Sequence, residues 1–385
     1  MLYMFSRLLK PPNHSFLLLG PRGTGKSTWI REHFPDIPTY DLLNTAEALR
    51  LSKEPHLLFN ELQGLKKESW AIIDEVQKVP ALLDEVHRLM ETKSIKFVLC
   101  GSSARKLKRG GANLLAGRAR TVQLFPLVSP EINDDVKLPD YFLFGSLPLS
   151  ITDHDPKSYL KSYAETYLQE EIKGEAATRN IGAFGRFLEV AARQNGQITN
   201  ISNIARDAQV ARQTVQGYFD ILVDTLLGYW LQPWKLKRTT KQVAHPKFYF
   251  FDSGIVRSLS GRLPYPPTQE EMGPLIETCI LNEVRAYLSY SRLHYPLYFW
   301  SSHDGVEVDL FCETQKGFTA IEIKAAPRWD NKFNRGLQRI QEEIGRTKIS
   351  CFGIYTGSRE ATFNQIQVLP VLDFLKRLWE GNIIY

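Results

Sequence analysis

The sequence predicts an α/β protein of two or three domains. In the N-terminal part, short apolar runs typical of strands alternate with helical segments, and two C-terminal runs alternate with the period of a strand. The 385 residues suffice for two or three domains at roughly 150 residues each. We expect domains at residues 1–135, 136–240 and 241–385.

The composition excludes disorder and membrane insertion as descriptions of the whole chain. Hydrophobic residues make up 43% and charged residues 23%, and no apolar run approaches the ~20 residues of a membrane span. The apolar residues 1–9 are too few for a signal peptide and lack a small-residue cleavage site, so we expect a cytoplasmic protein. The four cysteines have no paired spacing, which disfavours a disulfide framework or a zinc site.

The formal net charge of +6 is small, so the positions of the basic residues matter more than their number. Many of them gather in two stretches without acidic residues. Such stretches usually form solvated surface, and they are also what contact with phosphate groups requires. They comprise Arg105, Lys106, Lys108, Arg109, Arg118 and Arg120, and then Lys235, Lys237, Arg238, Lys241 and Lys247.

A phosphate-binding loop follows the first apolar strand, expected at residues 15–19. The glycines of such a loop let backbone N–H groups point at phosphate oxygens, at the positive end of the next helix. Lys26 is expected to reach the β- and γ-phosphates of ATP, and the Ser27 hydroxyl to hold Mg²⁺. The strand and helix on either side disfavour an ordinary turn. The loop comprises Gly20, Pro21, Arg22, Gly23, Thr24, Gly25, Lys26, Ser27 and Thr28.

A second apolar strand ends in Asp74 and Glu75. Ligands of open α/β sheets bind at the carboxyl ends of the strands. We expect Asp74 to orient Mg²⁺ through its water shell, and Glu75 to polarise the attacking water as a catalytic residue. Alone, such a strand end is more often a surface turn, but the phosphate-binding loop upstream favours catalysis.

A third apolar strand, at residues 95–100, leads to Ser102, whose small hydroxyl can contact the γ-phosphate. Further on, Arg118 follows Gly117. Arg118 is either a charge at a helix C-terminus or a catalytic arginine that reaches into the ATP site of a neighbouring subunit. The second role requires a homo-oligomer, which we expect.

Together these motifs resemble the prokaryotic AAA+ ATPases that carry a C-terminal PD-(D/E)XK nuclease-like domain. The resemblance rests on residues 20–28, 73–80 and 101–103 leading to Arg118, and continues through 141–145 and 247–254. It implies an α/β AAA+ P-loop core with a helical lid, a winged helix and a C-terminal restriction-endonuclease-like domain, with ATP and Mg²⁺ as cofactors. No lid arginine equivalent to the second sensor of other AAA+ proteins can be assigned.

The middle segment contains a helix-turn-helix pattern. Residues 201–208 predict one helix and residues 211–222 a second, whose Val215, Phe219 and Leu222 share one face. A DNA-reading helix would insert its other face into the major groove, whereas some winged helices serve only as packing modules. The DNA-binding candidates are Arg212, Gln213 and Gln216, with Lys237, Arg238 and Lys241 as phosphate contacts.

Two strands near the C-terminus alternate with a period of two, which places Glu307 and Asp309 on one face. Val306, Val308 and Leu310 are expected on the other face. If the turn is centred between residues 315 and 316, paired residues have numbers that sum to 631. Asp309 then faces Glu322, and Glu307 faces Lys324. Opposite side chains lie about 5 Å apart, and two carboxylates that close favour Mg²⁺ or Mn²⁺ between them.

An aspartate separated by 12 residues from Glu-x-Lys resembles the PD-(D/E)XK signature. This resemblance implies Asp309 and Glu322 as metal ligands and Lys324 as the catalytic residue that orients water and stabilises the transition state. It also implies an acidic residue on the first helix of the domain, for which Glu283 is the better candidate and Glu277 the other. The alternatives are a solvated hairpin, or a nuclease fold that only binds.

We therefore expect an ATP-hydrolysing protein that acts on DNA, single-stranded or branched DNA included, as a motor or clamp coupled to a metal-dependent nuclease-like domain. The alternative is a nucleotide-controlled signalling or defence switch. In that case the winged helix and the nuclease-like domain would be partner-binding modules. The triad of Asp309, Glu322 and Lys324 favours the first hypothesis, because a switch has no need of it.

Overall fold

The computed structural model describes residues 5–102, 115, 117–132, 136–167, 180–235, 245–345 and 347–385. Within this part of the chain, no helix is long and apolar enough to cross a bilayer. Several residues that the sequence singles out lie outside the described residues. They are Ser103, Arg105, Lys106, Lys108, Arg109, Lys237, Arg238 and Lys241.

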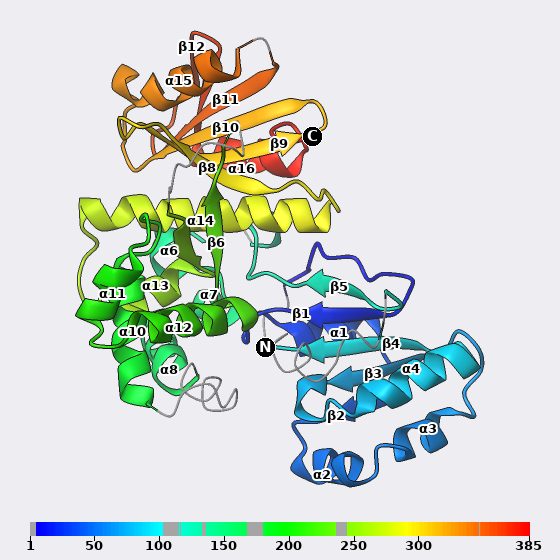
Figure 1. The fold of residues 1–385 in the computed structure, drawn as a ribbon. Coiled ribbons are helices and arrows are strands. Elements are labelled where there is room, and N and C mark those ends of the chain that lie inside the picture. The colour runs from blue at the N-terminus through cyan, green and yellow to red at the C-terminus, as the bar shows by residue number, and fades with distance from the viewer. Residues whose placement is uncertain are drawn as a thin grey trace.

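The N-terminal sheet has five parallel strands in the order β2-β3-β4-β1-β5 (Figure 1). β1, β3 and β4 lie where the sequence predicts apolar strands, and the parallel sheet confirms the α/β class. The elements are β1 (Phe16–Leu19), α1 (Lys26–His33), β2 (Thr39–Asp41), α2 (Thr45–Lys53), α3 (Leu57–Leu62), β3 (Trp70–Asp74), η1 (Val76–Lys78), α4 (Leu82–Lys93), β4 (Lys96–Gly101) and β5 (Arg120–Gln123).

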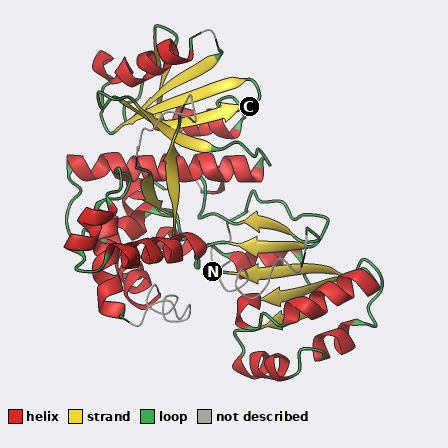
Figure 2. Ribbon diagram, viewed as in Figure 1, coloured by secondary structure: helices red, strands yellow, loops and turns green. Residues whose placement is uncertain are grey.

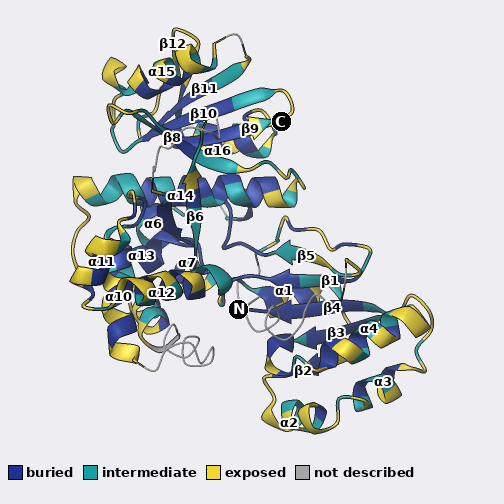
Figure 3. Ribbon diagram, in the orientation of Figure 1, coloured by how far each residue is buried: buried dark blue, intermediate teal, exposed yellow. Residues whose placement is uncertain are grey.

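Helices cover both faces of this sheet (Figure 2). Successive residues of β3 enter different cores: Ile72 packs with Trp29 of α1, and Ile73 packs with Leu83 of α4. The central strands β1, β3 and β4 are therefore buried on both sides, which Figure 3 shows mostly as dark blue, and this explains their continuous apolar sequences.

A group of helices follows, coloured teal to green in Figure 1. The two helices predicted for the helix-turn-helix are confirmed as α11 and α12, and Val215, Phe219 and Leu222 of α12 are buried. The elements are η3 (Ser129–Glu131), α6 (Leu138–Phe144), α7 (Pro148–Thr152), α8 (Pro156–Ser162), η4 (Tyr163–Tyr167), α10 (Ile181–Arg193), α11 (Ile201–Asp207), α12 (Arg212–Asp224), β6 (Gly228–Pro233), β7 (Lys247–Phe250) and α13 (Ser253–Leu259).

The C-terminal sheet has eight strands in the order β12-β13-β11-β10-β9-β8-β6-β7, with parallel and antiparallel pairs. The predicted boundary near residue 240 falls between β6 and β7, which pair with one another. The long helix α14 crosses the middle of the molecule (Figure 1). The elements are α14 (Gln269–Tyr290), β8 (Leu297–Ser301), β9 (Glu307–Thr314), β10 (Gly317–Lys324), η5 (Asn331–Asn334), α15 (Arg335–Ile344), β11 (Ile349–Tyr355), β12 (Ala361–Phe363), β13 (Ile366–Pro370) and α16 (Val371–Trp379).

The pairing of β9 with β10 follows the predicted register, since the paired residue numbers sum to 631 from Gly317–Thr314 to Ile321–Leu310. The predicted alternation along β9 is wrong, however. The pairing of β9 with β8 shifts between Tyr298 and Trp300, and Val308 and Leu310 consequently pack in different cores. This bulge gives β9 one residue more than its partner over that stretch, since Asp309 and Leu310 together lie opposite Phe299 of β8.

Candidate nucleotide site and a buried charged cluster

The phosphate-binding loop connects β1 to α1 at the carboxyl edge of the N-terminal sheet. Gly23 and Gly25 have φ angles of 75° and 90°, which side chains disfavour and glycine permits. The Lys26 ammonium is buried inside the loop, where it donates hydrogen bonds to the carbonyls of Gly20 and Pro21 at 2.7 and 3.1 Å. The loop thus surrounds one positive charge with backbone groups.

Ser27 and Asp74 meet in the way that a magnesium site requires. The Ser27 hydroxyl donates a hydrogen bond to Asp74 Oδ2 at 2.8 Å, although the residues lie on α1 and β3. Asp74 Oδ1 is buried and has no hydrogen-bond partner in the described part of the chain. A hydroxyl and a carboxylate with a free oxygen are hard ligands that suit Mg²⁺, so these residues fit the ion that the sequence predicts.

Glu75 is held in place by Gln77 and Ser102. The Gln77 amide donates hydrogen bonds to Glu75 Oε2 and, at 3.3 Å, to the Ser102 hydroxyl, which itself donates to Glu75 Oε2 at 3.4 Å. All three side chains are buried. Glu75 adopts a left-handed backbone conformation with φ 58°. Sequence reasoning missed the role of Gln77, since a glutamine two residues after a carboxylate is not a signal by itself.

A cavity of about 700 Å³ opens over this edge of the sheet, within the range of small-molecule sites. The loop contributes Lys26, Ser27 and Thr28 to its lining, and β3 contributes Glu75. The opposite wall comes from the N-terminal segment and from α7. The cavity therefore brings residues of the predicted ATP site together with groups that could contact a base or ribose.

Arg7 ties the N-terminal segment to the loop. Its guanidinium forms a buried ion pair with Glu131 at 2.9 Å and donates to the carbonyls of Thr24 and Phe125 at 2.6 and 2.7 Å. Burial raises the pKa of Glu131, and the charge of Arg7 opposes that shift. The sequence did not indicate Arg7, because its partners lie 17 to 124 residues away.

Arg118 forms an ion pair with Glu91 of α4 and is 39% exposed at its side chain. It does not line the cavity that contains Lys26. Its proposed action on a neighbouring subunit therefore stays a prediction.

A second cluster of charged side chains lies where β9 and β10 approach α14. Lys324 Nζ is 2.5 Å from Glu322 Oε1 and 3.9 Å from Asp309 Oδ2, and the backbone N–H of Ile323 donates to Asp309 Oδ2 at 2.7 Å. The cluster also contains Lys247, whose ammonium lies 2.8 Å from Glu307, and Glu277, which accepts a hydrogen bond from Tyr249 at 2.9 Å.

Two carboxyl groups of this cluster, those of Glu277 and Glu322, have raised pKa values. Burial, and then the charge of Asp309, raise the pKa of Glu277 to about 8, while Lys247 opposes the shift. The same two causes hold the pKa of Glu322 well above its ordinary value. Burial lowers the pKa of Lys324, but the charges of Asp309 and Glu322 outweigh that effect and raise it. The cluster thus contains more carboxyl groups than lysine ammonium groups.

Two carboxylates of the cluster suit a divalent cation. Glu322 Oε2 is buried without a hydrogen-bond partner among the described residues, and Asp309 lies beside it. Within the same residues, no three His, Cys, Asp or Glu side chains converge closely enough to hold a metal ion. The fit therefore rests on Asp309 and Glu322.

Two expectations about this cluster are wrong. Glu283, the preferred ligand on α14, lies elsewhere, where Ser129, Tyr141 and Trp379 donate hydrogen bonds to it. Glu277, the other candidate, is the residue of α14 that interacts with Asp309.

The other concerns the lysine partner of Glu307. Glu307 pairs with Lys247, where the sequence predicted Lys324. Lys247 itself is 4% exposed, so it does not belong to a basic surface.

The DNA-binding candidates Arg212, Gln213 and Gln216 are exposed on α12. Val215 and Phe219 of the same helix are buried, so the polar side chains lie on the face away from the core.

Family models match the chain in three consecutive parts. Residues 12–133 match a model described as an AAA domain. Residues 135–265 and 272–374 match two models described as domains of unknown function, DUF8612 and DUF4143. Residues 12–133 therefore form an AAA-type ATPase domain.

The chain is similar to an uncharacterized protein of Mycobacterium tuberculosis, with 29% identity over 318 residues that cover 80% of this chain and 69% of the relative. An uncharacterized protein of Haemophilus influenzae is 21% identical over 224 residues, 54% of this chain and 56% of that protein.

Among solved structures, the Orc1 protein of Aeropyrum pernix in complex with DNA has 13% identity and a TM-score of 0.29, over 66% of this chain and 87% of that one. A Signal Transduction ATPase with Numerous Domains protein of Pyrococcus horikoshii has 14% identity and a TM-score of 0.23, over 73% of this chain and 46% of that one.

Proposed function

We propose that the protein hydrolyses ATP in its AAA-type domain and uses this reaction to act on DNA. The observation that carries the ATPase part is the meeting of Ser27, Asp74 and Glu75 beside Lys26 at one edge of the sheet. These residues come from two elements, and all of them have the chemistry that phosphoryl transfer needs.

Each residue has a defined task in this reaction. Lys26 and the loop N–H groups bind the phosphates, Ser27 and Asp74 would hold Mg²⁺, and Ser102 is assigned to the γ-phosphate. Glu75, positioned by Gln77, accepts a hydrogen bond from the attacking water and polarises it. Mg²⁺ held by Ser27 and Asp74 would supply positive charge that offsets the negative charge of the phosphates.

Action on DNA is supported by the exposed polar face of α12 and by Lys235 after β6. We assign the helix-turn-helix with β6 and β7 as a winged helix, and the helices from α6 to α8 as the lid. The protein forms homo-oligomers in which Arg118 serves the neighbouring site.

The test is ATP turnover with and without single-stranded, double-stranded and branched DNA. We expect turnover that Lys26→Ala abolishes and that at least one DNA form stimulates. Lys53→Ala is the control, because Lys53 is an exposed lysine of the same domain. Turnover that no DNA changes would contradict the action on DNA and leave the ATPase standing.

A second activity, metal-dependent cleavage of DNA, is favoured by the cluster of Asp309, Glu322 and Lys324. Asp309 and Glu322 would hold Mg²⁺ or Mn²⁺, and the ion would activate water and stabilise charge on the phosphate. Lys324, within 3.9 Å of both carboxylates, orients the water. Glu277 adds a carboxyl group from α14.

Cleavage of linear, flapped and branched DNA with Mg²⁺ or Mn²⁺ tests this activity. Lys324→Ala should abolish cleavage, whereas Lys376→Ala, which removes an exposed lysine of α16, should not. Metal binding without cleavage of any DNA would reduce the domain to a clamp. The alternative hypothesis of a signalling switch would then be better supported, although neither the fold nor the comparisons favour it.

A further inference from the structure

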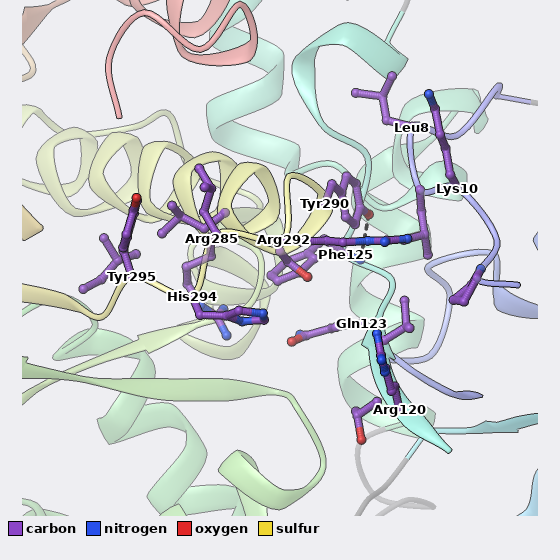
Figure 4. Close-up of a pocket in the computed structure, with 18 of the residues that line it drawn as sticks. Leu8, Lys10, Arg120, Gln123, Phe125, Arg285, Tyr290, Arg292, His294 and Tyr295 are labelled. Carbon is purple, nitrogen blue, oxygen red and sulfur yellow. Dashed lines mark hydrogen bonds between the residues drawn. The ribbon is translucent and has the colours of Figure 1, made fainter. Parts of the chain in front are cut away.

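A second cavity, of about 860 Å³, lies between the N-terminal sheet and α14. Its walls are the segment at residues 8–14, β5, β6 and the end of α14 with the loop that follows. Figure 4 shows Arg120 and Gln123 of β5 on one side and Arg285, His294 and Tyr295 on the other. It shares no lining residue with the cavity at the phosphate-binding loop.

The lining of this cavity is strongly cationic. It contains four lysine or arginine side chains and two histidines, but no aspartate or glutamate. Within the described part of the chain, none of the four cations forms an ion pair. A cavity with this charge attracts anions and repels cations. The six residues are Lys10, His14, Arg120, Arg285, Arg292 and His294.

Arg285 is the cation that most needs an anionic partner. Its guanidinium carbon lies 3.6 Å from the centroid of the Tyr229 ring and 5.4 Å from that of Phe125. Burial lowers the pKa of Arg285, since the charge has left water without a carboxylate to replace it. Aromatic rings compensate only part of that cost.

Two neutral side chains in the lining also have no polar partner. The hydroxyl of Tyr229 and both ring nitrogens of His14 are buried without hydrogen bonds among the described residues. Burial, and then the charges of Arg120 and Arg292, lower the pKa of His14. A neutral histidine and a phenol can both donate to an acceptor, and phosphate oxygens only accept.

Flat aromatic surfaces lie beside these donors. Trp230, Tyr290 and Tyr295 line the cavity together with Tyr229 and Phe125. Nucleobases stack on such rings, and the volume is within the range of sites for ligands of nucleotide size. A lone phosphate would use the cations and leave the aromatic walls without a partner.

We propose that this cavity binds a nucleoside phosphate, with Arg285, Arg292 and Arg120 on the phosphates and the aromatic side chains on the base. The ligand is either a free nucleotide or the phosphorylated end of a nucleic acid strand, because both present the same groups. The site is separate from the ATP site and goes beyond the proposed function.

Titration calorimetry on the full-length protein, saturated with ADP and Mg²⁺, tests the proposal with the 5′-phosphorylated dinucleotide pApA as probe. One probe should bind per chain. Arg292→Gln and Arg120→Gln, both at exposed positions, should each weaken binding several-fold, and Arg285→Gln roughly ten- to a hundredfold. Lys53→Gln, which removes an exposed cation elsewhere, should leave probe binding unchanged.

Three further probes identify the ligand. The first two are a 12-nucleotide single strand with a 5′-phosphate and the same strand without it. If the phosphorylated strand binds more tightly than both pApA and the unphosphorylated strand, the ligand is a strand end. If pApA binds as tightly as the phosphorylated strand, the ligand is a free nucleotide. Inorganic triphosphate that binds as tightly as pApA would overturn recognition of the base. No binding of pApA, or binding that neither Arg292→Gln nor Arg120→Gln weakens in folded protein, would overturn the site.

Discussion

Glu75 occupies a backbone conformation that glutamate rarely adopts, with φ 58° directly after a buried strand. Such a conformation costs about 1 to 3 kcal/mol and persists only where the surroundings enforce it. The hydrogen bonds from Gln77 and Ser102 supply that enforcement. In this conformation Glu75 lines the same cavity as Lys26.

Lys26→Ala and Glu75→Gln should both abolish ATP turnover, but they should differ in binding. Removing Lys26 takes a positive charge from the phosphate cradle, so ATP affinity should fall. Glu75→Gln keeps the cradle and should retain ATP with Mg²⁺. Equilibrium binding of labelled ATP separates the two, and an equal loss of affinity in both variants would mean that Glu75 has another role.

Gln77→Leu should lower kcat for ATP about tenfold and change KM little, because Gln77 positions Glu75 without contacting the nucleotide. Gln63→Leu, at an exposed glutamine of the same domain, is the matched control. Steady-state kinetics measure both. A rise in KM with unchanged kcat would show that Gln77 contributes to binding instead.

Glu283 makes stability depend on pH. Burial raises its pKa to about 7 although Trp379, Tyr141 and Ser129 donate hydrogen bonds to it. The folded protein therefore holds a proton that the unfolded chain loses near pH 4.5. This contribution to stability is complete below about pH 4.5 and is lost as the pH rises to 7, at up to roughly 1.4 kcal/mol per pH unit.

Urea unfolding of wild type and Glu283→Gln at pH 5 and pH 8 tests this dependence. Glutamine cannot ionise, so the variant should gain stability relative to wild type as the pH rises. Glu360→Gln, at an exposed residue, controls for the general pH effect. If the unfolding free energies of wild type and Glu283→Gln differ by the same amount at both pH values, Glu283 has the same charge state at pH 5 and pH 8.

At the scale of elements, the sequence predicts the strands and their pairing better than it predicts which side chains lie on which face of a strand or helix. The register of β9 with β10 depends on one turn, and the turn residues locate it. The bulge at Asp309 depends on β8, which is distant in sequence, so no local pattern reports it. Glu277 and Glu283 are six positions apart on α14, roughly 240° around the helix, and only the packing of the helix decides which one approaches β9.

Mg²⁺ or Mn²⁺ should stabilise the protein against heat, and Asp309→Asn should remove that gain by deleting one ligand charge. When the free ion is at a hundred times its dissociation constant, its binding adds about 2.7 kcal/mol to the free energy of unfolding. Thermal unfolding without nucleotide, with and without the ion, measures the effect. Asp330→Asn, at an exposed position on the same domain, should keep the gain. If both variants keep it, the ion binds elsewhere.

At the scale of the whole molecule, chain order and spatial order differ. β6 follows α12 in the middle segment, yet it joins the C-terminal sheet through β8. Composition and motif spacing describe continuous segments, so they could not predict a strand that pairs across a domain boundary. The same limitation explains Lys247, which a charge count places on a surface and the fold places beside Glu307.

Mixing variants tests the expected assembly. Lys26→Ala and Arg118→Ala should each be inactive alone, and a mixture should recover part of the ATP turnover, since some interfaces then combine an intact loop with an intact arginine. Arg88→Ala, which removes another cation from the neighbouring surface of α4, should not impair turnover. No recovery at any ratio, with assembly verified by sedimentation, would exclude Arg118 as the shared arginine.

Arg7 lines the cavity at the phosphate-binding loop and contacts Phe125, which lines the second cavity. Its guanidinium donates to the carbonyl of Thr24 in the phosphate-binding loop and to that of Phe125, whose ring faces Arg285. If a ligand in one cavity changes the binding free energy of a ligand in the other through this side chain, that change is a coupling free energy. A coupling free energy has the same value in both directions. The factor by which ATP changes affinity at the second cavity must therefore equal the factor by which that cavity's ligand changes affinity for ATP.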